Sequence, residues 1–387
     1  MTKIAIAQTQ LSESRDAGRA LGRHLAETLQ TVPDAVILFA SPTYEFSSLL
    51  QALKQECRPK CLVGCSSAGE FTHEVQGEGM ACALALCSSE MQFTAARGHQ
   101  LRDNHRQAAE EVVSVFHGIS NRSFRYRYAL VLVDALAGYT EEFIEQLTLL
   151  TAGSYQFFGG GAGDNAQFRH TPVFYDTQVL SDAVVTLEIL SKKPWGIGVQ
   201  HGWRPSGSPM RATETQNMHL ISLNAIPAVE ALQEHALATE QVFDLENPLP
   251  FFLHNILGID TGFGYKLRVP LAADTAGSIL CAAAIPSGVK VSLMQASSVS
   301  SVEAAASAVE NALAQLNGGK PAAALFFDCV ATRLRMGREF GLELKAIQER
   351  VGSTPLVGCN THGQIARSEG QFNGFHNCTA VVCLIPE

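Results

Sequence analysis

The chain has 387 residues and a formal net charge of −9, with 46% hydrophobic and 17% charged residues. This length allows two or three domains with substantial cores, and the composition is that of a globular protein rather than a disordered one. The acidic balance, without a basic stripe interleaved with aromatic residues, argues against a nucleic-acid-binding surface. No apolar run approaches the roughly 20 residues of a spanning helix, and the N-terminus lacks the long apolar stretch of a signal peptide. We therefore expect a cytoplasmic protein with no membrane insertion.

Ten cysteines are spread along the chain, and without an export signal we expect them to be mostly reduced. Cys57, Cys61 and Cys65 are spaced by four residues, but Pro59 interrupts the helix that would align them. The tight Cys-x-x-Cys spacing of common zinc and cluster sites is absent from this group, which argues against a metal site there. Whether the three cysteines bind a metal stays open.

Strand and helix patterns alternate through the first 90 or so residues. The first helix carries leucines four residues apart on its apolar face, with Ser12 or Ser14 as the expected N-cap. The predicted elements are a strand at 3–7, a helix at 12–30, a strand at 36–40, a helix at 45–56, a strand-like run at 61–63 and a strand at 77–87.

The same order recurs twice, with a period of about 95 residues. The second copy has strands at 92–96, 129–134, 173–175 and 183–190, helices at 104–116 and 141–150, and a strand-like run at 157–158. The third copy is predicted to start with a strand near 289–294 and to continue with helices at 301–316 and 341–351 and strands at 323–328 and 379–385. This repetition predicts an α/β fold with mixed sheets, built from three strand-helix-strand-helix-strand units.

Residues 194–288 differ in character and are predicted to be a bridging region between the second and third copies. It contains a predicted helix at 225–238 and strand-like runs at 264–269 and 278–284. We therefore predict two domains, 1–225 and 226–387.

Three loops of small residues, at 62–70, 156–165 and 356–366, each follow a strand-like run. Small residues expose backbone N–H groups and hydroxyls, so three such strand edges suggest one composite binding site. The alternative is that the glycines only permit tight turns. The candidate binding residues are Gly64, Cys65, Ser66, Ser67, Gly69, Glu70, Gly160, Gly161, Asp164, Asn165, Cys359, Asn360, Thr361, His362 and Asn377.

His362 lies within the third loop, three residues after Cys359, and could coordinate iron if the loops converge. The alternative is a histidine on the surface of a loop. Asp164 could bind a ligand amine, although a cap on the following turn is favoured.

Common catalytic signatures are absent. Gly64 to Gly69 contains G-x-S-x-x-G, one residue longer than the nucleophile elbow, and the glycine run at 159–163 lacks both a dinucleotide fingerprint and a Walker lysine. The sequence H-E-x-x-H does not occur, which argues against a hydrolytic zinc site.

Several motifs, taken in order, resemble the FIST family of bacterial sensory domains, with its N-terminal and C-terminal halves. They cover nearly the whole chain: FASP at 39–42, GCSSAGE at 64–70, FFGGGAGDN at 157–165, HGWRPSG at 201–207, IPSG at 285–288, PLVGCNTHGQIA at 355–366 and FHNCT at 375–379.

The resemblance implies a cytoplasmic ligand-sensing domain rather than an enzyme, with a FIST N-terminal-like half and a FIST C-terminal-like half. It also implies a partner histidine kinase or cyclic-di-GMP enzyme. A subset of stand-alone members resembles nitric-oxide-sensing haem proteins, so haem is a candidate cofactor with His362 as its candidate iron ligand, and an unknown small ligand is the alternative. Two places depart from the family pattern: CVATRLRM at 329–336 replaces a C-x-G-R-G-like turn, and Gln364 stands where an acidic residue is common. These departures imply that the pocket of the second half holds a different ligand, or none.

Two other functions compete with the sensor. A hydrolase could use Cys65 or Ser66 as its nucleophile and Glu70 in acid–base work. A partner-binding protein with an empty cleft would respond to no small molecule.

Overall fold

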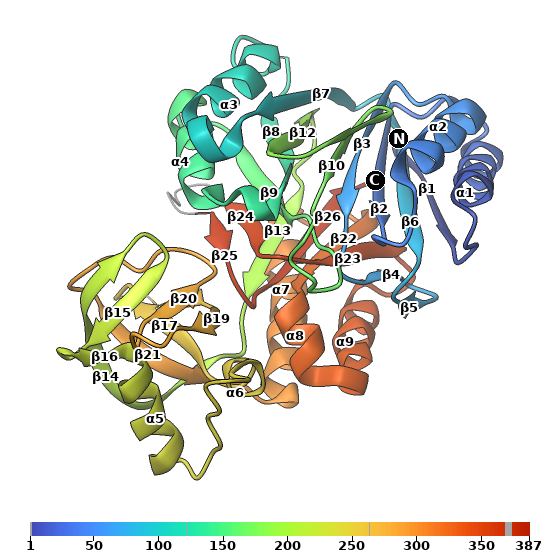
Figure 1. Cartoon of the computed structure of the whole chain (residues 1–387). Coiled ribbons are helices and arrows are strands. Elements are labelled where there is room, and N and C mark those ends of the chain that lie inside the picture. Colours follow the sequence, from blue (N-terminus) through green and yellow to red (C-terminus); the bar gives the residue numbers. More distant parts are fainter. Residues whose placement is uncertain (1, 122, 263, 368–373) are drawn as a thin grey trace.

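The computed structural model describes residues 2–121, 123–262, 264–367 and 374–387. These residues form three similar α/β units and a separate, mostly β-stranded module (Figure 1). The predicted α/β class with mixed sheets and three repeated units is confirmed.

The first unit covers the N-terminal quarter of the chain. Its elements are β1 (Thr2–Thr9), α1 (Ser14–Leu29), β2 (Ala35–Ala40), α2 (Phe46–Cys57), β3 (Cys61–Ser66), β4 (Glu70–Thr72), β5 (Gln76–Gly77) and β6 (Ala81–Ser88). Neither predicted serine caps α1, because the carboxylate of Glu13 accepts the N–H groups of Arg15 and Asp16 instead.

The second unit repeats this order. Its elements are β7 (Met91–His99), α3 (Leu101–Val115), β8 (Tyr126–Val133), the 3₁₀ turn η1 (Ala135–Ala137), α4 (Thr140–Leu150), β9 (Gln156–Gly161), β10 (Val173–Tyr175), β11 (Gln178–Leu180) and β12 (Ala183–Ser191).

The third unit begins with β13 (Gly196–Gln200) and resumes after the module. Its other elements are α7 (Ser298–Gln315), β22 (Pro321–Cys329), α8 (Val330–Met336), η2 (Gly337–Phe340), α9 (Gly341–Val351), β23 (Leu356–Thr361), β24 (Gln364–Arg367), β25 (Phe375–His376) and β26 (Ala380–Pro386).

The predicted start of the third unit, at 289–294, is wrong. That run forms β21 in the module, whereas β13 pairs with β26 at the edge of the third sheet. Strand β13 was not predicted because its glycines are typical of a loop. The packing of α7 accounts for these glycines, since a Cβ at Gly198 would lie 1.7 Å from the carbonyl oxygen of Ala308. The strand is glycine-rich because a helix backbone lies directly against it.

Each unit contributes its hairpin to a neighbouring unit's sheet. The sheet orders are β1-β6-β2-β3-β10-β11, β7-β12-β8-β9-β24-β25 and β13-β26-β22-β23-β4-β5. Hairpin β10–β11 extends the first sheet, β24–β25 the second and β4–β5 the third, so the three units are linked in a cycle.

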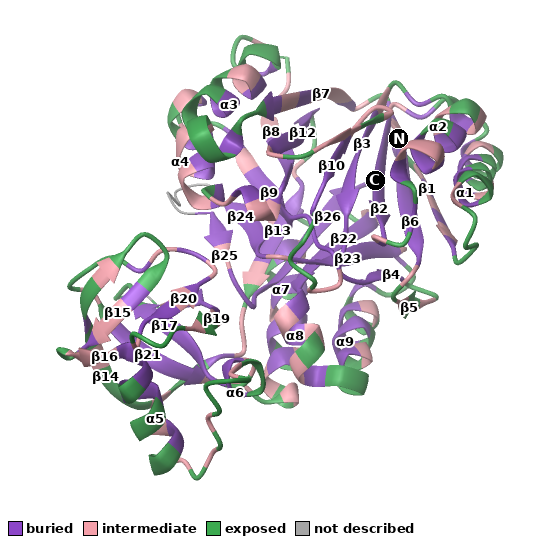
Figure 2. Cartoon of the chain, in the orientation of Figure 1, coloured by how far each residue is buried: buried purple, intermediate pink, exposed green. Residues whose placement is uncertain are grey.

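The three sheets pack their inner faces around one hydrophobic core that draws residues from all three units. Their outer faces are covered by α1 and α2 on the first sheet, α3 and α4 on the second, and α7 and α9 on the third. The central strands are therefore buried on both faces (Figure 2), which accounts for their nearly continuous apolar sequences.

The module lies between β13 and α7 in the sequence, at the lower left of Figure 1. It contains β14 (Arg204–Gln216), β15 (His219–Leu223), β16 (Ile226–Pro227), α5 (Ala228–Ala238), α6 (Leu249–Phe252), β17 (Ile256–Asp260), β18 (Tyr265–Arg268), β19 (Pro270–Ala273), β20 (Ile279–Cys281) and β21 (Lys290–Gln295). These strands form one sheet, and the predicted domain boundary at residue 225 falls within it, between β15 and β16.

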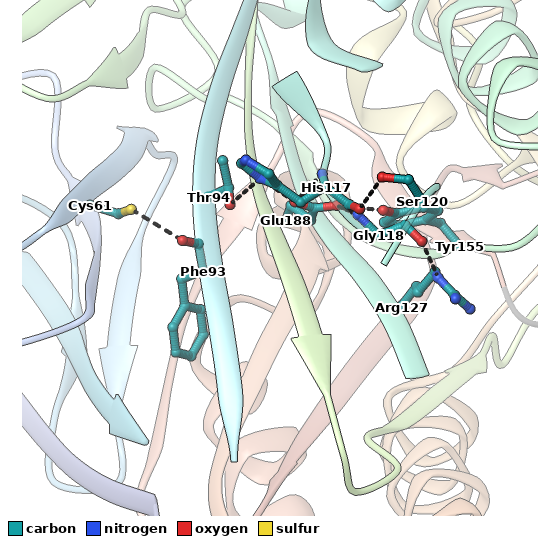
Figure 3. A network of polar contacts seen from close by, with 9 residues as sticks. All are labelled: Cys61, Phe93, Thr94, His117, Gly118, Ser120, Arg127, Tyr155 and Glu188. Atoms are coloured by element: carbon teal, nitrogen blue, oxygen red, sulfur yellow. Dashed lines mark hydrogen bonds and ion pairs between the residues drawn. The ribbon is translucent and has the colours of Figure 1, made fainter. Parts of the chain in front are cut away.

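A buried carboxylate on β12 holds the loop that follows α3 (Figure 3). Glu188 is fully buried and accepts the N–H groups of His117 and Gly118, each at 2.9 Å, together with the hydroxyl of Tyr155. Arg127 donates to the carbonyl oxygen of Gly118 at 2.6 Å. Because these donors satisfy the carboxylate, we assign this network a structural role.

All ten cysteines are free thiols in the structure. Among the described residues, none of the helices has the length and apolar character needed to cross a membrane.

Candidate functional site

The three small-residue loops meet in a ring of backbone hydrogen bonds. Each loop donates an N–H to the next: Gly163 to the carbonyl oxygen of Ser66 at 2.9 Å, His362 to that of Gly161 at 3.0 Å, and Ala68 to that of Asn360 at 2.9 Å. The donors occupy equivalent positions in the three units, as do the acceptors. The ring therefore has approximate threefold symmetry.

Glycine is required where each loop leaves its strand. Gly64, Gly159 and Gly358 pair with Leu38, Val131 and Phe326, respectively. A Cβ at these glycines would lie 2.2, 2.1 and 1.9 Å from the carbonyl oxygens of those partners. These glycines permit close packing, which is the structural alternative to direct ligand contact.

Most candidate binding residues lie inside the ring, away from any cavity described below. Cys65, Ser66 and Cys359 have no exposed surface. A substrate cannot reach Cys65 or Ser66 in this arrangement, so the loop does not present a nucleophile. The other fully or almost fully buried candidates are Gly64, Ser67, Gly69, Glu70, Gly160, Gly161, Asn360 and Thr361.

Glu70 is the most buried acid of the first loop, at 1% exposed. Its carboxyl group accepts the hydroxyl of Ser67 at 2.5 Å and the N–H of Met80 at 3.1 Å. Burial raises the pKa of Glu70 to about 7, because the charged form is poorly solvated.

Asp164 acts as the cap that the sequence favours. Its carboxylate accepts the N–H groups of Gln167, Phe168, Arg169 and His170 at 2.6–3.1 Å. Burial opposes ionisation of this carboxylate, but these backbone donors outweigh it and the pKa of Asp164 is lowered. The cap fixes a loop in which Phe168 has a φ of 53°.

The ring of Phe168 stacks on the imidazole of His362, with 4.8 Å between ring centroids. The side chain of His362 is 7% exposed, and its Nε2 lies 3.7 Å from Oδ1 of Asp164. Neither imidazole nitrogen makes a hydrogen bond to another described residue. Burial lowers the pKa of His362 to about 4, so the ring is neutral near pH 7.

A cavity of about 740 Å³ lies beside His362, between the second unit, the third unit and the module. Among its walls are η1, the start of α4, α8 and the β19–β20 region. Most lining residues are apolar; those used below are Arg102, Leu136, Tyr139, Glu141, Glu142, Phe168, Leu271, Ala282, Ala331, His362 and Asn377.

The cavity lies beyond the carboxyl ends of β8 and β9, where the second sheet runs parallel. This edge is where open α/β sheets ordinarily bind ligands, because loops and helix N-termini converge there. Of the predicted binding residues, His362 and Asn377 line the cavity. Asn165 lies in the loop capped by Asp164, between the cap and Phe168.

An ion-pair cluster joins the core to the module at the cavity wall. Glu141, at the start of α4, contacts Lys266 and places a carboxylate oxygen 2.5 Å from Nη2 of Arg268. The side chains of Glu141 and Arg268 are 18% and 2% exposed. Burial lowers the pKa of Lys266 to about 7, with a further contribution from the positive charge of Arg268, and burial lowers the pKa of Arg268 to about 10.

The arrangement of His362 does not fit axial coordination of haem. An axial ligand needs an imidazole nitrogen open to the cavity, and both nitrogens are covered here. Phe168 stacks on the ring and Asp164 faces Nε2, so both would have to rearrange. Among the described residues no group of three His, Cys, Asp or Glu side chains could hold a metal ion.

Sequence reasoning missed most of the cavity. Glu141 and Arg268 are 127 positions apart, and the module's lining residues come from the region predicted to be a bridge. A local motif does not reveal such a site, because it forms only when the module folds against the core. One signal for the position of the site was available. The segment that forms η1 and the start of α4 directly follows a buried strand, and the first residues of α4 have no side-chain cap.

The fold and cavity define an α/β protein with a ligand-sized site between its repeated core and an inserted module. Family models match as the FIST N domain over residues 34–226 and the FIST C domain over residues 228–367. The chain belongs to the FIST domain family, whose members are generally small-ligand-sensing domains in signalling.

Relatives share the full length of the chain at low identity. An uncharacterized protein of Mycobacterium tuberculosis is 24% identical over 392 residues, covering 99% of each chain. An uncharacterized protein of Mycobacterium bovis is 23% identical over 397 residues, covering 99% of this chain and 98% of the relative.

Similarity to solved structures is weak. Cyanuric acid hydrolase from A. caulinodans aligns over 100% of both chains with a TM-score of 0.36 and 8% identity. PurLQS from Thermotoga maritima aligns over 99% of this chain and 72% of its own, with a TM-score of 0.24 and 8% identity.

Proposed function

We propose that this chain is a sensor that binds a small ligand in the cavity between the second unit and the module. The observation that carries the proposal is the cavity itself, whose volume of about 740 Å³ is typical of small-molecule sites. Its walls come from parts of the chain that are distant in sequence, so a ligand would contact the core and the module together. Binding can therefore change how strongly the two associate, provided that the ligand binds one arrangement better than another.

A thermal-shift screen of small molecules tests this proposal. A ligand that binds the folded protein raises its melting temperature. We expect Ala331→Phe on α8 and Ala282→Phe after β20 to abolish that rise, because each places an aromatic ring in the cavity. Ala238→Phe, at an exposed position on α5, is the matched control and should leave the rise unchanged.

Two results would contradict the cavity as the sensing site. One is a screen in which no compound shifts the melting temperature. The other is a set of ligands whose effect survives both cavity-filling substitutions.

We propose that the output goes to a separate signalling protein, either a histidine kinase or a cyclic-di-GMP enzyme. The family's role in signalling supports this proposal. Kinase and cyclic-di-GMP turnover assays with candidate partners, run with the chain in its free and ligand-bound forms, test it. Rates that do not respond to either form would contradict the proposal.

Haem-based nitric oxide sensing stays a separate prediction, and it requires Phe168 to move away from His362. An absorption spectrum of protein expressed with excess haem precursor tests it. A stoichiometric Soret band that shifts with nitric oxide and disappears in His362→Ala would support haem binding through this residue. A spectrum without such a band would contradict it.

A further inference from the structure

We infer that the cavity takes an uncharged, mostly apolar molecule whose polar end donates a hydrogen bond to Asn377. This inference rests on the proposed function, because it names the class of ligand for the same cavity.

The distribution of charge around the cavity argues for an uncharged ligand. The acidic lining residues Glu141 and Glu142 lie beside the buried cations Lys266 and Arg268. Glu141 therefore has cationic partners within the protein, and the negative charge of Glu142 acts on Arg268. A charged ligand would add a charge for which this cluster offers no free counterpart, at a cost in desolvation.

The other basic lining residues, Arg102 and His362, offer an anionic ligand no free positive charge, and the Cys329 thiol, whose pKa is lowered to about 6 by its contact with Cys378, adds negative rather than positive charge. Arg102 is exposed, and its guanidinium already donates to the carbonyl oxygen of Leu136 at 3.1 Å. His362 is neutral near pH 7 and is covered by Phe168. Neither offers a buried, unused positive charge to an anionic ligand.

Apolar contacts account for most of the cavity wall. Leu136, Leu271 and Ala331 represent its three sides, from the second unit, the module and α8. A ligand that removes this surface from water gains free energy in proportion to the apolar area buried. The cavity is thus suited to a hydrocarbon or aromatic body.

Asn377 supplies a specific polar contact. The residue is 2% exposed, and its Nδ2 donates to the carbonyl oxygen of His376 at 3.3 Å. Its Oδ1 is covered in this arrangement and accepts no hydrogen bond from the described residues, but Asn377 lines the cavity, so a turn of its amide group would present this acceptor to a ligand. A buried acceptor without a donor is costly, so a ligand O–H or N–H at this point would be favoured.

Three naphthalene probes test separately whether the ligand is uncharged and whether it donates a hydrogen bond to Asn377, because they share one ring system and differ only at the polar group. 2-Naphthol is uncharged and donates a hydrogen bond, 2-methoxynaphthalene is uncharged without a donor, and 2-naphthoate is an anion. Titration of the full chain by saturation-transfer NMR or calorimetry gives their relative affinities. We expect 2-naphthol to bind about tenfold more tightly than the methoxy compound, as one hydrogen bond predicts. The anion should bind most weakly.

Two variants assign these differences to the cavity. Asn377→Leu should remove the preference for naphthol over the methoxy compound while keeping the binding of both. Ala331→Phe should abolish binding of all three probes, and Ala238→Phe should change none of it.

The possible failures are distinguishable. Tighter binding of 2-naphthoate, blocked by Ala331→Phe, would overturn the ligand class while leaving the cavity as the sensing site. Equal affinities for naphthol and its methyl ether would overturn the role of Asn377. Failure of the proposed function itself would show instead in the thermal-shift screen, as ligands of any class that Ala331→Phe does not affect.

Discussion

The second and third units end their parallel strands in the same way but use the space beyond them differently. In the second unit the chain leaves β8 through the short turn η1, and the cavity lies open next to it. In the third unit the chain leaves β22 directly into α8 and η2 before α9 begins. A short connection leaves room for a ligand, and a long one fills the equivalent position with protein.

The polar residues at the two ends differ accordingly. At the third unit, Asp328 and Glu343 are 1% and 2% exposed, and Asn360 is fully buried beside Asp328 in the strand pairing. Burial raises the pKa values of both carboxyl groups, and their proximity raises that of Asp328 further. The closed end therefore buries two acids inside the protein near Arg335 of α8, whereas the open end pairs Glu141 with two cations from the module.

The largest effect is expected from a substitution at one of the glycines that pack against a neighbouring strand in every unit. This close backbone packing is the frame that both ends share. Gly358→Ala would place a Cβ 1.9 Å from the carbonyl oxygen of Phe326. This oxygen belongs to the backbone of a buried strand, so it cannot move far enough to remove the clash. We expect a loss of more than about 4 kcal/mol in the free energy of unfolding, seen as failure to accumulate folded protein. Gly77→Ala is the control, because a Cβ there meets only the sulfur atom near the end of the Met80 side chain, at 3.3 Å. Equal stability of the two variants would contradict the shared frame.

The next largest effect is expected at the open end. Glu141→Leu would leave Arg268, which is 2% exposed, without its carboxylate partner. We expect a loss of about 3–5 kcal/mol, measured by urea unfolding, with faster proteolysis of the link between β21 and α7.

The control for this change is an exposed ion pair on α3. Arg106 and Glu110 have side chains 72% and 50% exposed. Glu110→Leu should cost less than about 1 kcal/mol. If the two losses were similar, the Glu141 cluster would not be what holds the module to the core.

A smaller, pH-dependent effect is expected at the closed end. The pKa values of Asp328 and Glu343 are raised in the folded state. Their contribution to the free energy of unfolding is therefore fully present below their unfolded pKa values of about 4, and it is lost as pH rises through the folded values. Glu343→Gln should reduce this fall and make the variant about 1–3 kcal/mol more stable than the parent near pH 8, with little gain near pH 4.

Urea unfolding across this pH range measures the difference. Glu349→Gln is the matched control on the same helix, because the side chain of Glu349 is 61% exposed. A pH profile that Glu343→Gln leaves unchanged would contradict burial of a protonated carboxyl pair.

Local sequence patterns predicted the repeated elements but not their exchange between units. The helices and buried strands carry period-3.6 and apolar signals, so α1, β2 and α9 were found within about two residues of their bounds. Strand β13 was missed because its glycines resemble a loop, and only the packing of α7 against Gly196 and Gly198 explains them. Hairpin exchange depends on tertiary contacts and leaves no local signal.

The candidate site was predictable only where it uses the repeated loops. His362 and Asn377 were selected from sequence, and both line the cavity. The other loop residues were selected for the same small, polar character, but this character here serves the close packing of three backbones. The module's wall depends on folding against the core, so residues such as Leu271 and Ala282 gave no signal.

Hydrogen–deuterium exchange of the full chain, with and without a ligand found by thermal shift, tests the central claim most directly. Binding at the open end predicts slower exchange in residues 135–142, 269–271 and 280–284, which line the cavity from the core and the module. Because α8 forms one wall of the cavity, slower exchange there also fits the account, but residues 337–343, which follow α8, should change little. Protection confined to the loop at 64–70, or to the closed end at 337–343, would contradict the account.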